Sequence, residues 1–276
     1  MRLRGDPRGG GQGAARWTDV AELSPYALCA IVGAEDPAFF QHRGIWWSQV
    51  AARLYSAARS GGRAVAVSTI TQQLARNLYL SEERSGTRKL FEVLLARRLE
   101  AVLEKRRILE LYVNVVEWGP GTWGIEDAAR AYFDASPRSL NPFQAVVLAS
   151  LLPAPRAPLA GRNLDRALSS QVRLLHFLYG AGVMSLPDWR ETSARMRLLA
   201  AAVRGGRAAG EVLKELGARP YERLPDDEGP LTSAELLESG CGLPLRIAYT
   251  AVLRGGDPRR RAMLRLPHRW TGGMIG

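Results

Sequence analysis

The sequence predicts a mainly α-helical protein. In most segments apolar residues recur every three or four positions, which is the spacing of one face of a helix. Capping residues and prolines mark where several of these patterns begin and end. Convincing alternation of apolar and polar residues, the mark of a strand, is scarce. Hydrophobic residues make up 46% of the 276 residues, which is enough for a substantial core.

The first helical pattern covers residues 25–35. Ser24 is a good N-cap, and Pro25 suits the first helical position. Pro37 disfavours α geometry at Asp36, so the helix should end near Glu35. A second pattern covers 46–59, and a third begins after Ser68 as its N-cap and ends at 78. Further helical patterns cover 88–112, 125–133, 141–152 and 163–180. The segments between them include a loop at 60–63, an apolar run at 64–67, a polar stretch at 81–87 and an irregular, glycine-punctuated stretch at 115–124.

The two ends of the chain differ from this helical centre. Residues 1–20 are rich in glycine and arginine, which is typical of a disordered lead-in. We therefore expect a lead-in over 1–20, one domain over 21–184 and a helical C-terminal extension over 185–276, in which the sequence shows no chemical motif. The extension contains candidate helices at 188–203, 207–217 and 233–237, a Pro- and acid-rich connector at 219–230, an apolar segment at 243–253 and a basic tail at 254–269.

The strong positive charge limits the choice of partners. The formal charge of +11 and the pI of about 10.3 favour a polyanion, such as nucleic acid, an anionic bilayer or a phosphorylated substrate. However, 35 of the 38 basic residues are arginine, a bias that can reflect genome composition. A nucleic-acid-binding role would rest on charge alone, so we expect no nucleic-acid partner.

Cysteines, histidines and apolar runs exclude other classes. Cys29 and Cys241 are too far apart in sequence to indicate a disulfide framework or a metal site, and Cys29 is expected to be a buried free thiol. The three histidines are scattered, which argues against zinc. The first 21 residues contain no run resembling a signal peptide, and the most apolar stretch, 143–152, is shorter than a bilayer span.

Two adjacent carboxylates, Glu35 and Asp36, come at the end of the first helix. A carboxylate there meets the negative end of the helix dipole. If Phe39 and Phe40 also shield Glu35 from water, its pKa should rise toward the working pH, as a general base requires. The alternative is an exposed acidic turn followed by an aromatic anchor.

The segment 68–77 predicts a helix with an amide-rich polar face. Ile70, Leu74 and Leu78 recur every four residues and form its buried edge. Many directed donors on one surface suit sugar hydroxyls and phosphate oxygens. The alternative is a capped amphipathic helix with a solvated face. The polar face gathers Thr69, Gln73, Arg76 and Asn77.

A third acidic residue, Glu92, lies close to an apolar stripe that includes Leu95, Leu99 and Leu103. A carboxylate on such a stripe is costly unless it is paired or lines a cavity. Arg88 precedes it by four residues, so one interpretation is a plain surface ion pair, worth little. The other is a second carboxylate that faces a pocket shared with Glu35.

Four segments together resemble the family 51 glycosyltransferases, the peptidoglycan glycosyltransferases. These occur as monofunctional transglycosylases and as the polymerase domain of bifunctional penicillin-binding proteins. The resemblance covers roughly residues 22–180, and VNVVEWGPGTWG looks most like the monofunctional branch. The segments, in the order and approximate spacing of the family, are AEDPAFFQHRG, STITQQLARN, RKLFE and KRRILELYVNVVEWGPGTWGIEDAARAYF.

The resemblance implies a fold, a reaction and a location. The fold would be a lysozyme-like helical domain with a smaller membrane-facing lobe and an extended cleft. The reaction would polymerise lipid II into β-1,4 glycan strands, with inversion at the donor anomeric carbon and release of undecaprenyl diphosphate. The family acts at the outer, periplasmic face of the bacterial inner membrane, so lipid II, the nascent strand, the membrane surface and other cell-wall synthesis or division proteins become expected partners.

The resemblance also implies roles for individual residues. Glu35 matches the catalytic base, which deprotonates the acceptor 4-hydroxyl. Glu92 matches a second glutamate that helps to position the donor diphosphate, directly or through a divalent cation such as Mg²⁺ or Mn²⁺, with no all-protein metal cage. Other matched positions are Asp36, His42, Ser68, Thr69, Gln73, Arg76 and Asn77 for substrate binding and Arg84, Arg88, Lys89 and Lys105 for balancing the diphosphate charge.

The sequence departs from the family pattern at several positions. Arg76 stands where lysine is usual, which keeps the charge and changes the donor geometry. Ala66 and Asp134 replace common glycines, Trp46 replaces an acidic residue, and the N-terminal anchor usual in the family is not visible. Rival functions are a non-catalytic relative that binds lipid II or glycan as an assembly scaffold, and a lysozyme-like hydrolase.

Overall fold

The computed structural model describes residues 17–62, 68–80, 86–221 and 232–241. These residues are mainly helical, as the sequence predicts, with one short antiparallel hairpin among them. The elements in chain order are η1 (Val20–Glu22), α1 (Pro25–Glu35), η2 (Phe39–Gln41), α2 (Trp47–Ser60), α3 (Ile70–Tyr79), α4 (Gly86–Val102), α5 (Lys105–Val115), β1 (Glu117–Gly119), β2 (Thr122–Trp123), α6 (Ile125–Phe133), η3 (Pro137–Ser139), α7 (Pro142–Leu151), α8 (Gly161–Gly180), α9 (Leu186–Arg204), α10 (Ala209–Ala218) and α11 (Ser233–Ser239).

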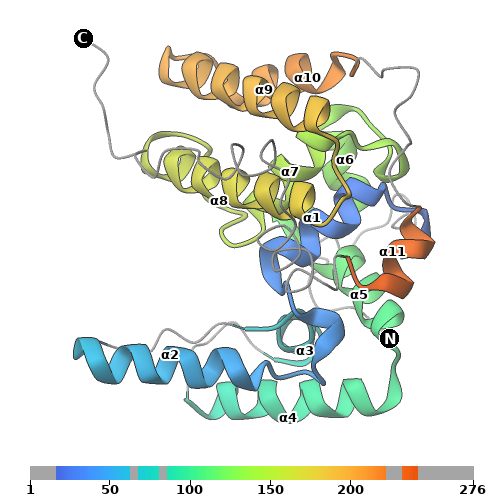
Figure 1. Ribbon diagram of the computed structural model, residues 1–276, viewed down its shortest axis with the longest axis vertical. Helices are drawn as coiled ribbons and strands as arrows, with labels where there is room; N and C mark the ends of the chain where they lie inside the picture. The colour runs from blue at the N-terminus through green and yellow to red at the C-terminus, as the bar shows by residue number, and fades with distance from the viewer. Residues whose placement is uncertain (1–16, 63–67, 81–85, 222–231, 242–276) are drawn as a thin grey trace, which may run out of the picture.

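Helices α1 and α7 form the centre of the core. Residues 26–32 of α1 are all buried, and so is every residue of α7. A helix that is apolar on all sides needs neighbours on all sides. Accordingly α1 packs against α7 and α8, while α7 also contacts α6 and α9 (Figure 1). This packing holds α1 rigidly, with its carboxyl end, Glu35, directed away from the centre toward α3.

A smaller lobe is formed by α2, α3 and α4, which lie together at the lower end of Figure 1. Helix α3 is its link to the core, because α3 packs against both α4 and α5. Of the predicted apolar edge of α3, Ile70 and Leu74 are fully buried, and Leu78 is half-buried against the core. By contrast, α2 buries none of its residues. The lobe therefore presents a largely uncovered helix at the edge of the molecule.

Two predicted elements differ from the structure. The single helix predicted over 88–112 is two helices, because the backbone of Glu104 is extended and serves as the N-cap of α5. The break lets α5 turn its apolar side, including Ile108 and Leu109, fully into the core. Similarly, α3 begins at Ile70 and is capped by Thr69, whose side chain and that of Gln72 form a capping box. The predicted cap one residue earlier was wrong.

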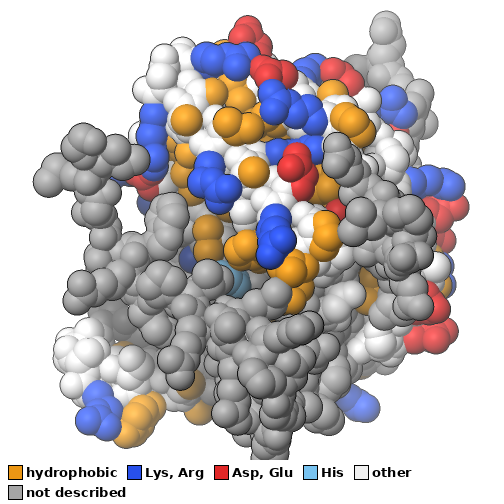
Figure 2. Space-filling view, turned by 45° about the horizontal axis from the view of Figure 1, so that its top comes forward, with side chains coloured by type: hydrophobic (Ala, Val, Ile, Leu, Met, Phe, Trp, Pro, Cys, Tyr) orange, Lys and Arg blue, Asp and Glu red, His pale blue; other side chains and the backbone are white. Residues whose placement is uncertain are grey.

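The surface charge is spread out on the face that Figure 2 shows. There Lys and Arg side chains are separated by hydrophobic side chains and by a few carboxylates, with no single basic block. Many arginines also form exposed ion pairs, for example Arg204 with Asp165 and Arg156 with Glu117. Pairs of this kind contribute little stability. The basic side chains of the described residues are thus scattered over this face.

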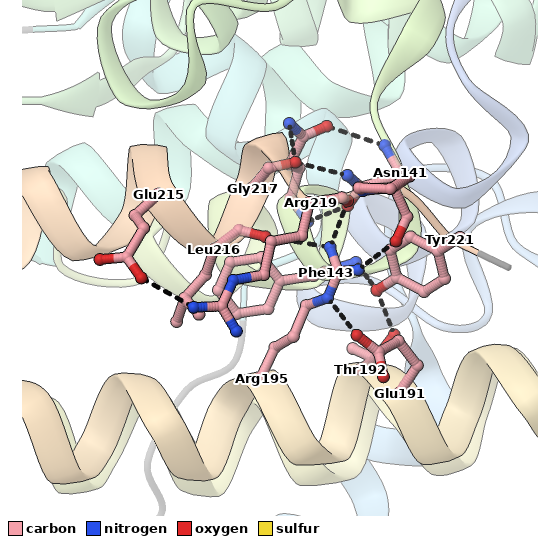
Figure 3. A network of polar contacts seen from close by, with 12 residues as sticks. Asn141, Phe143, Glu191, Thr192, Arg195, Glu215, Leu216, Gly217, Arg219 and Tyr221 are labelled. Atoms are coloured by element: carbon pink, nitrogen blue, oxygen red, sulfur yellow. Dashed lines mark hydrogen bonds and ion pairs between the residues drawn. The ribbon is translucent and has the colours of Figure 1, made fainter.

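The helices beyond residue 185 share the core of the preceding domain. Helix α9 packs against α7 and α8, and α10 packs against α6 and α9. Arg195, which is 1% exposed, holds the end of α10 through its guanidinium (Figure 3). It donates to the carbonyls of Leu216, Arg219 and Pro220 at 2.7–3.0 Å, and it lies 4.1 Å from the ring centre of Tyr221. These contacts fasten α10 and Tyr221 onto the domain.

Several predictions fall outside the described residues. These are the lead-in up to residue 16, the apolar run at 64–67, part of the polar stretch at 81–87, most of the connector at 219–230, the apolar segment at 243–253 and the basic tail. Residues 17–20 of the predicted lead-in do lie on the domain, where the N–H of Thr18 donates to Asn114. Among the described residues, no helix combines the length and the hydropathy that a bilayer span requires.

A disulfide joins the first helix to the C-terminal extension, so the expectation of a free thiol at Cys29 was wrong. Cys29 in α1 is bonded to Cys241, with 5.4 Å between their Cα atoms and a sequence separation of 212. The short helix α11 packs against η1 and α1, and the hydroxyl of Ser233 donates to the carbonyl of Leu23. The spacing of the cysteines gave no signal because the pairing depends entirely on this tertiary contact.

We expect the disulfide to stabilise the fold strongly. Cross-linking residues so far apart restricts the unfolded chain, and for a loop of this length the effect is up to about 5 kcal/mol. Cys241→Ala should therefore lower the melting temperature by about 10 °C. The measurement is thermal unfolding with and without a reductant. The reductant should destabilise the wild-type protein and leave Cys241→Ala unchanged; equal melting temperatures for all four samples would show that the bond does not form.

Candidate active site

Glu35 is the last residue of α1 and lies at the edge of the core. The backbone leaves the helix at Asp36, as Pro37 predicts. Oε2 of Glu35 accepts a 2.6 Å hydrogen bond from Nε2 of Gln73. Oε1 is buried and has no hydrogen-bond partner within the described part of the chain. One oxygen of this carboxylate is thus held by the protein, and the other is left for a ligand.

The environment of Glu35 raises the pKa of its carboxyl. Burial is the largest cause, and the nearby charge of Asp36 adds to it. The hydrogen bond from Gln73 and the charge of Arg76 act in the opposite direction and only partly compensate. Phe39 is fully buried and Phe40 packs against the core, so both belong to the apolar surroundings of this helix end. A carboxylate with a raised pKa is suited to accept a proton near neutral pH.

Gln73 projects from α3 and contacts groups from three other segments. Its Nε2 donates to Glu35 and lies 3.4 Å from the carbonyl oxygen of Ser68. Its Oε1 accepts a 3.2 Å hydrogen bond from the hydroxyl of Tyr112, on α5. The polar face predicted for this helix therefore meets Glu35. The hydrogen bond from Tyr112 to Gln73 was not predicted from the sequence.

Asp36 and His42 form an internal support below the site. Asp36 is 1% exposed and accepts a 3.1 Å hydrogen bond from the N–H of Ile70, the first residue of α3. Nε2 of His42 lies 2.9 and 3.0 Å from the two oxygens of Asp36. Nearby, the hydroxyl of Thr69 donates to the carbonyl of Gly44 at 2.7 Å. These contacts join the end of α1 to the start of α3 and occupy Asp36 with protein groups.

Glu92 forms a second charged cluster on α4. It is 1% exposed, and its two oxygens accept hydrogen bonds from Arg88 at 2.6 Å and from Lys89 at 2.8 Å. Lys89 also donates to the hydroxyl of Ser68 at 2.8 Å. A buried carboxylate with two cationic partners is not the weak surface pair of the alternative interpretation. The cluster has one positive charge in excess.

A chain of polar contacts links the two glutamates. It runs from Glu35 to the amide of Gln73, on to Ser68, and through Lys89 to Glu92. The links come from α1, the residue before the N-cap of α3, α3 itself and α4. The two carboxylates are thus joined through one network of polar contacts.

Other predicted site residues lie elsewhere or have different partners. Lys105 donates to Glu100 at 2.6 Å and lies 4.2 Å above the ring of Phe39. Burial lowers the pKa of Lys105, and Glu100 also accepts from Thr71. Arg84 lies outside the described residues. The charge of Arg76 is close enough to lower the pKa of Glu35. Asn77, on the same helix, is half-buried.

Tyr112 is the residue of the site that sequence reasoning missed. It lies in the segment that the family resemblance covers, but nothing in the local pattern distinguishes it from a core aromatic. A signal did exist, because a tyrosine on a fully buried helical face needs a hydrogen-bond partner for its hydroxyl. Only the fold shows that the partner is Gln73.

The stability of the protein should report on Glu35 as the pH changes. Because its folded-state pKa is raised, the folded protein binds this proton more tightly than the unfolded chain. The stability that this carboxyl contributes is therefore fully present below pH 4.5, the ordinary pKa of a glutamate, and is lost as the pH rises through the raised pKa of the folded state. Glu35→Gln should be more stable than the wild type at pH 7 to 8 and equal to it at low pH. Urea unfolding across this range checks the prediction; a pH-independent difference would contradict it.

Comparison with known proteins identifies the family. The family model described as Transglycosylase matches residues 8–178. Three similar proteins, each named biosynthetic peptidoglycan transglycosylase, come from Laribacter hongkongensis (42% identical, covering 58% of this chain and 70% of the relative), Alcanivorax borkumensis (47%, covering 50% and 57%) and Brucella suis (40%, covering 64% and 77%). With more than half of its residues matched by the family model, this chain belongs to the transglycosylase family.

Proposed function

We propose that this chain, as a peptidoglycan glycosyltransferase, joins lipid II units into β-1,4-linked glycan strands, with Glu35 as the catalytic base. Family membership and the names of its relatives support the reaction class. The observation that supports Glu35 most directly is its free, buried Oε1 together with its raised pKa. Gln73 holds the other oxygen, so the base has a defined orientation.

The proposed chemical step is a displacement at the donor sugar. Oε1 of Glu35 takes the proton from the 4-hydroxyl of the acceptor N-acetylglucosamine. The acceptor oxygen attacks C1 of the donor N-acetylmuramic acid while the bond from C1 to the diphosphate oxygen breaks. Undecaprenyl diphosphate leaves with the bonding electron pair, and the α-linked donor becomes a β-1,4 linkage. Positioned charges near the leaving group lower the barrier because negative charge grows there.

Arg88 and Lys89 are the groups that we assign to the leaving diphosphate. Both are held by Glu92, which is itself anionic and would repel a diphosphate that approached it directly. Glu92 therefore acts by fixing the two cations, one of which also contacts Ser68. This arrangement gives preorganised positive charge at the far end of the network from Glu35.

A divalent cation is part of the proposal, but it is carried by the substrate. Both oxygens of Glu92 are already held by cations, so this carboxylate does not fit a metal ion without losing a partner. No group of three or more His, Cys, Asp or Glu side chains suited to a metal occurs among the described residues. We therefore infer that Mg²⁺ or Mn²⁺ enters on the diphosphate itself, and no step above depends on it.

The small lobe is the surface that we propose to meet the membrane. Lipid II is embedded in a bilayer, so the enzyme must act at its surface. Helices α2 and α4 expose apolar side chains that a water-facing surface would not favour. Arginines on the same helices, such as Arg53 and Arg98, suit anionic headgroups. The exposed apolar set is Trp47, Val50, Leu54 and Tyr55 on α2 and Leu90, Phe91, Leu94 and Val102 on α4.

The disulfide supports a site of action outside the cytoplasm. Disulfides persist in oxidising compartments and are rare where thiols are kept reduced. The Cys29–Cys241 bond is therefore what we expect of a protein that works on the outer, periplasmic face of the inner membrane, where lipid II is polymerised. Other cell-wall synthesis or division proteins are proposed partners there.

The role of Glu35 as the base predicts a large and specific loss of activity. Purified wild-type protein with lipid II and Mg²⁺ should form glycan polymer, and Glu35→Gln should reduce the rate by at least about 10²-fold. Gel analysis of labelled product measures both. Glu238→Gln, an exposed glutamate on α11, is the control and should be fully active. Lipid II binding without polymer by the wild type would instead favour a scaffold, and sugar release from sacculi would favour a hydrolase.

Membrane docking through the small lobe predicts a selective loss of vesicle binding. Leu54→Ser combined with Leu94→Ser removes apolar area from α2 and α4 and should weaken vesicle partitioning at least about tenfold. Sedimentation with vesicles of phosphatidylethanolamine and phosphatidylglycerol measures the effect. Leu198→Ser is the matched control, because Leu198 is similarly exposed, at 48%, on α9. An equal loss of vesicle binding in the Leu54→Ser, Leu94→Ser variant and in Leu198→Ser would refute a docking surface on α2 and α4.

A further inference from the structure

Tyr112 joins the buried core to the proposed base. It lies on α5 with no exposed surface, and its hydroxyl donates to Oε1 of Gln73. Gln73 in turn donates to Glu35. The phenol therefore lies one residue away from the carboxylate and does not contact it directly. Neither the reaction nor the family resemblance assigned a role to this side chain.

The orientation of the Gln73 amide depends on its neighbours. Its nitrogen faces two acceptors, the carboxylate of Glu35 and the carbonyl of Ser68. Its oxygen faces the hydroxyl of Tyr112, which can donate. A flipped amide would place its oxygen against two other oxygens. In the observed orientation, the phenol of Tyr112 supplies the hydrogen bond that Oε1 of Gln73 accepts.

The hydroxyl of Tyr112 stays protonated throughout the working range. Burial raises the pKa of this phenol well above its ordinary value of 10.0, and the negative charge of Glu35 raises it further. At neutral pH it is therefore protonated and can donate to Gln73. An amide held in this way presents its N–H groups to Glu35 before substrate arrives, which is the preorganisation that efficient catalysis requires.

We propose that Tyr112 is a positioning residue for Glu35, which acts through Gln73 to decide which carboxylate oxygen is held and which is free to take the proton. The inference rests on the proposed role of Glu35 as the base. Without the phenol hydroxyl, Oε1 of Gln73 becomes a buried acceptor that has lost its donor. The amide then keeps its two contacts on the nitrogen side but loses the one on the oxygen side, and its hydrogen bond to the ionised carboxylate weakens.

The test is the pH dependence of polymerisation by Tyr112→Phe, which removes one oxygen and keeps the ring. A weaker hydrogen bond to the ionised form raises the pKa of Glu35, so the acid limb of the rate profile should move to higher pH. We expect kcat to fall about tenfold near neutral pH. The loss should shrink as the pH rises, and KM for lipid II should be unchanged. A wild-type profile would overturn the inference.

Tyr26→Phe is the matched control. Tyr26 is also a buried tyrosine, and its hydroxyl contacts Asp188 at 3.2 Å. It lies on α1, the helix that ends in Glu35, so a general loosening of this helix should appear in both variants. We expect a similar fall in melting temperature for the two variants and an unshifted pH profile for Tyr26→Phe alone. An equal shift in both would reduce Tyr112 to a structural role.

Two further variants separate the possible causes of failure. Gln73→Met should show the same pH shift, and adding Tyr112→Phe to it should cost no further activity, because the phenol acts through the amide. Additive losses would overturn the inference. If Tyr112→Phe does not fold, 3-fluorotyrosine at position 112 keeps the hydroxyl as a stronger donor and should move the acid limb to lower pH; no shift counts against the inference. Activity retained in Glu35→Gln would instead refute the proposed base.

Discussion

The hydrogen bond from the N–H of Ile70 to the buried carboxylate of Asp36 is the contact on which the site depends. It joins the last turn of α1 to the first residue of α3, and Nε2 of His42 lies against both oxygens of the same carboxylate. A buried carboxylate is costly unless its oxygens are satisfied, so this arrangement tolerates little displacement. Because α1 is enclosed by the core, the contact places α3, and with it Gln73, at a defined distance from Glu35.

The two glutamates of the network have different surroundings, in keeping with the different roles that we propose for them. Glu35 has one neutral hydrogen-bond partner, its other oxygen has none among the described residues, and burial raises the pKa of its carboxyl. Glu92 has a cation on each oxygen, Arg88 on one and Lys89 on the other. In the proposed mechanism, proton transfer therefore takes place at the end of α1, and the charge of the leaving group is balanced from α4. Ser68 and Gln73 lie between the two glutamates in the network and connect them.

Much of the fold was predictable from local patterns, and the exceptions have physical causes. The bounds of α1 and α6 follow from proline, glycine and apolar spacing, and the predicted ranges for these two helices match the structure. The break at Glu104 was missed because residues on both sides keep helical spacing, and only burial of α5 requires the turn. The motifs indicated Glu35 and Glu92, but their link through Ser68 and Lys89 is tertiary. The pairing of Cys29 with Cys241 likewise depends on long-range packing that no local pattern encodes.

The disulfide also sets an order of events during synthesis and export. Its first half lies in the helix that ends in the proposed base, and its second half is made 212 residues later. The helix can dock on α7 and α8 before then, but its covalent tie to α11 must wait until almost all of the described chain has left the ribosome and met an oxidant. A product that stops short of residue 241 would keep Glu35, the proposed base, and lack this cross-link. The cross-link therefore makes part of the stability of the first helix depend on residues that are synthesised near the end of the described chain.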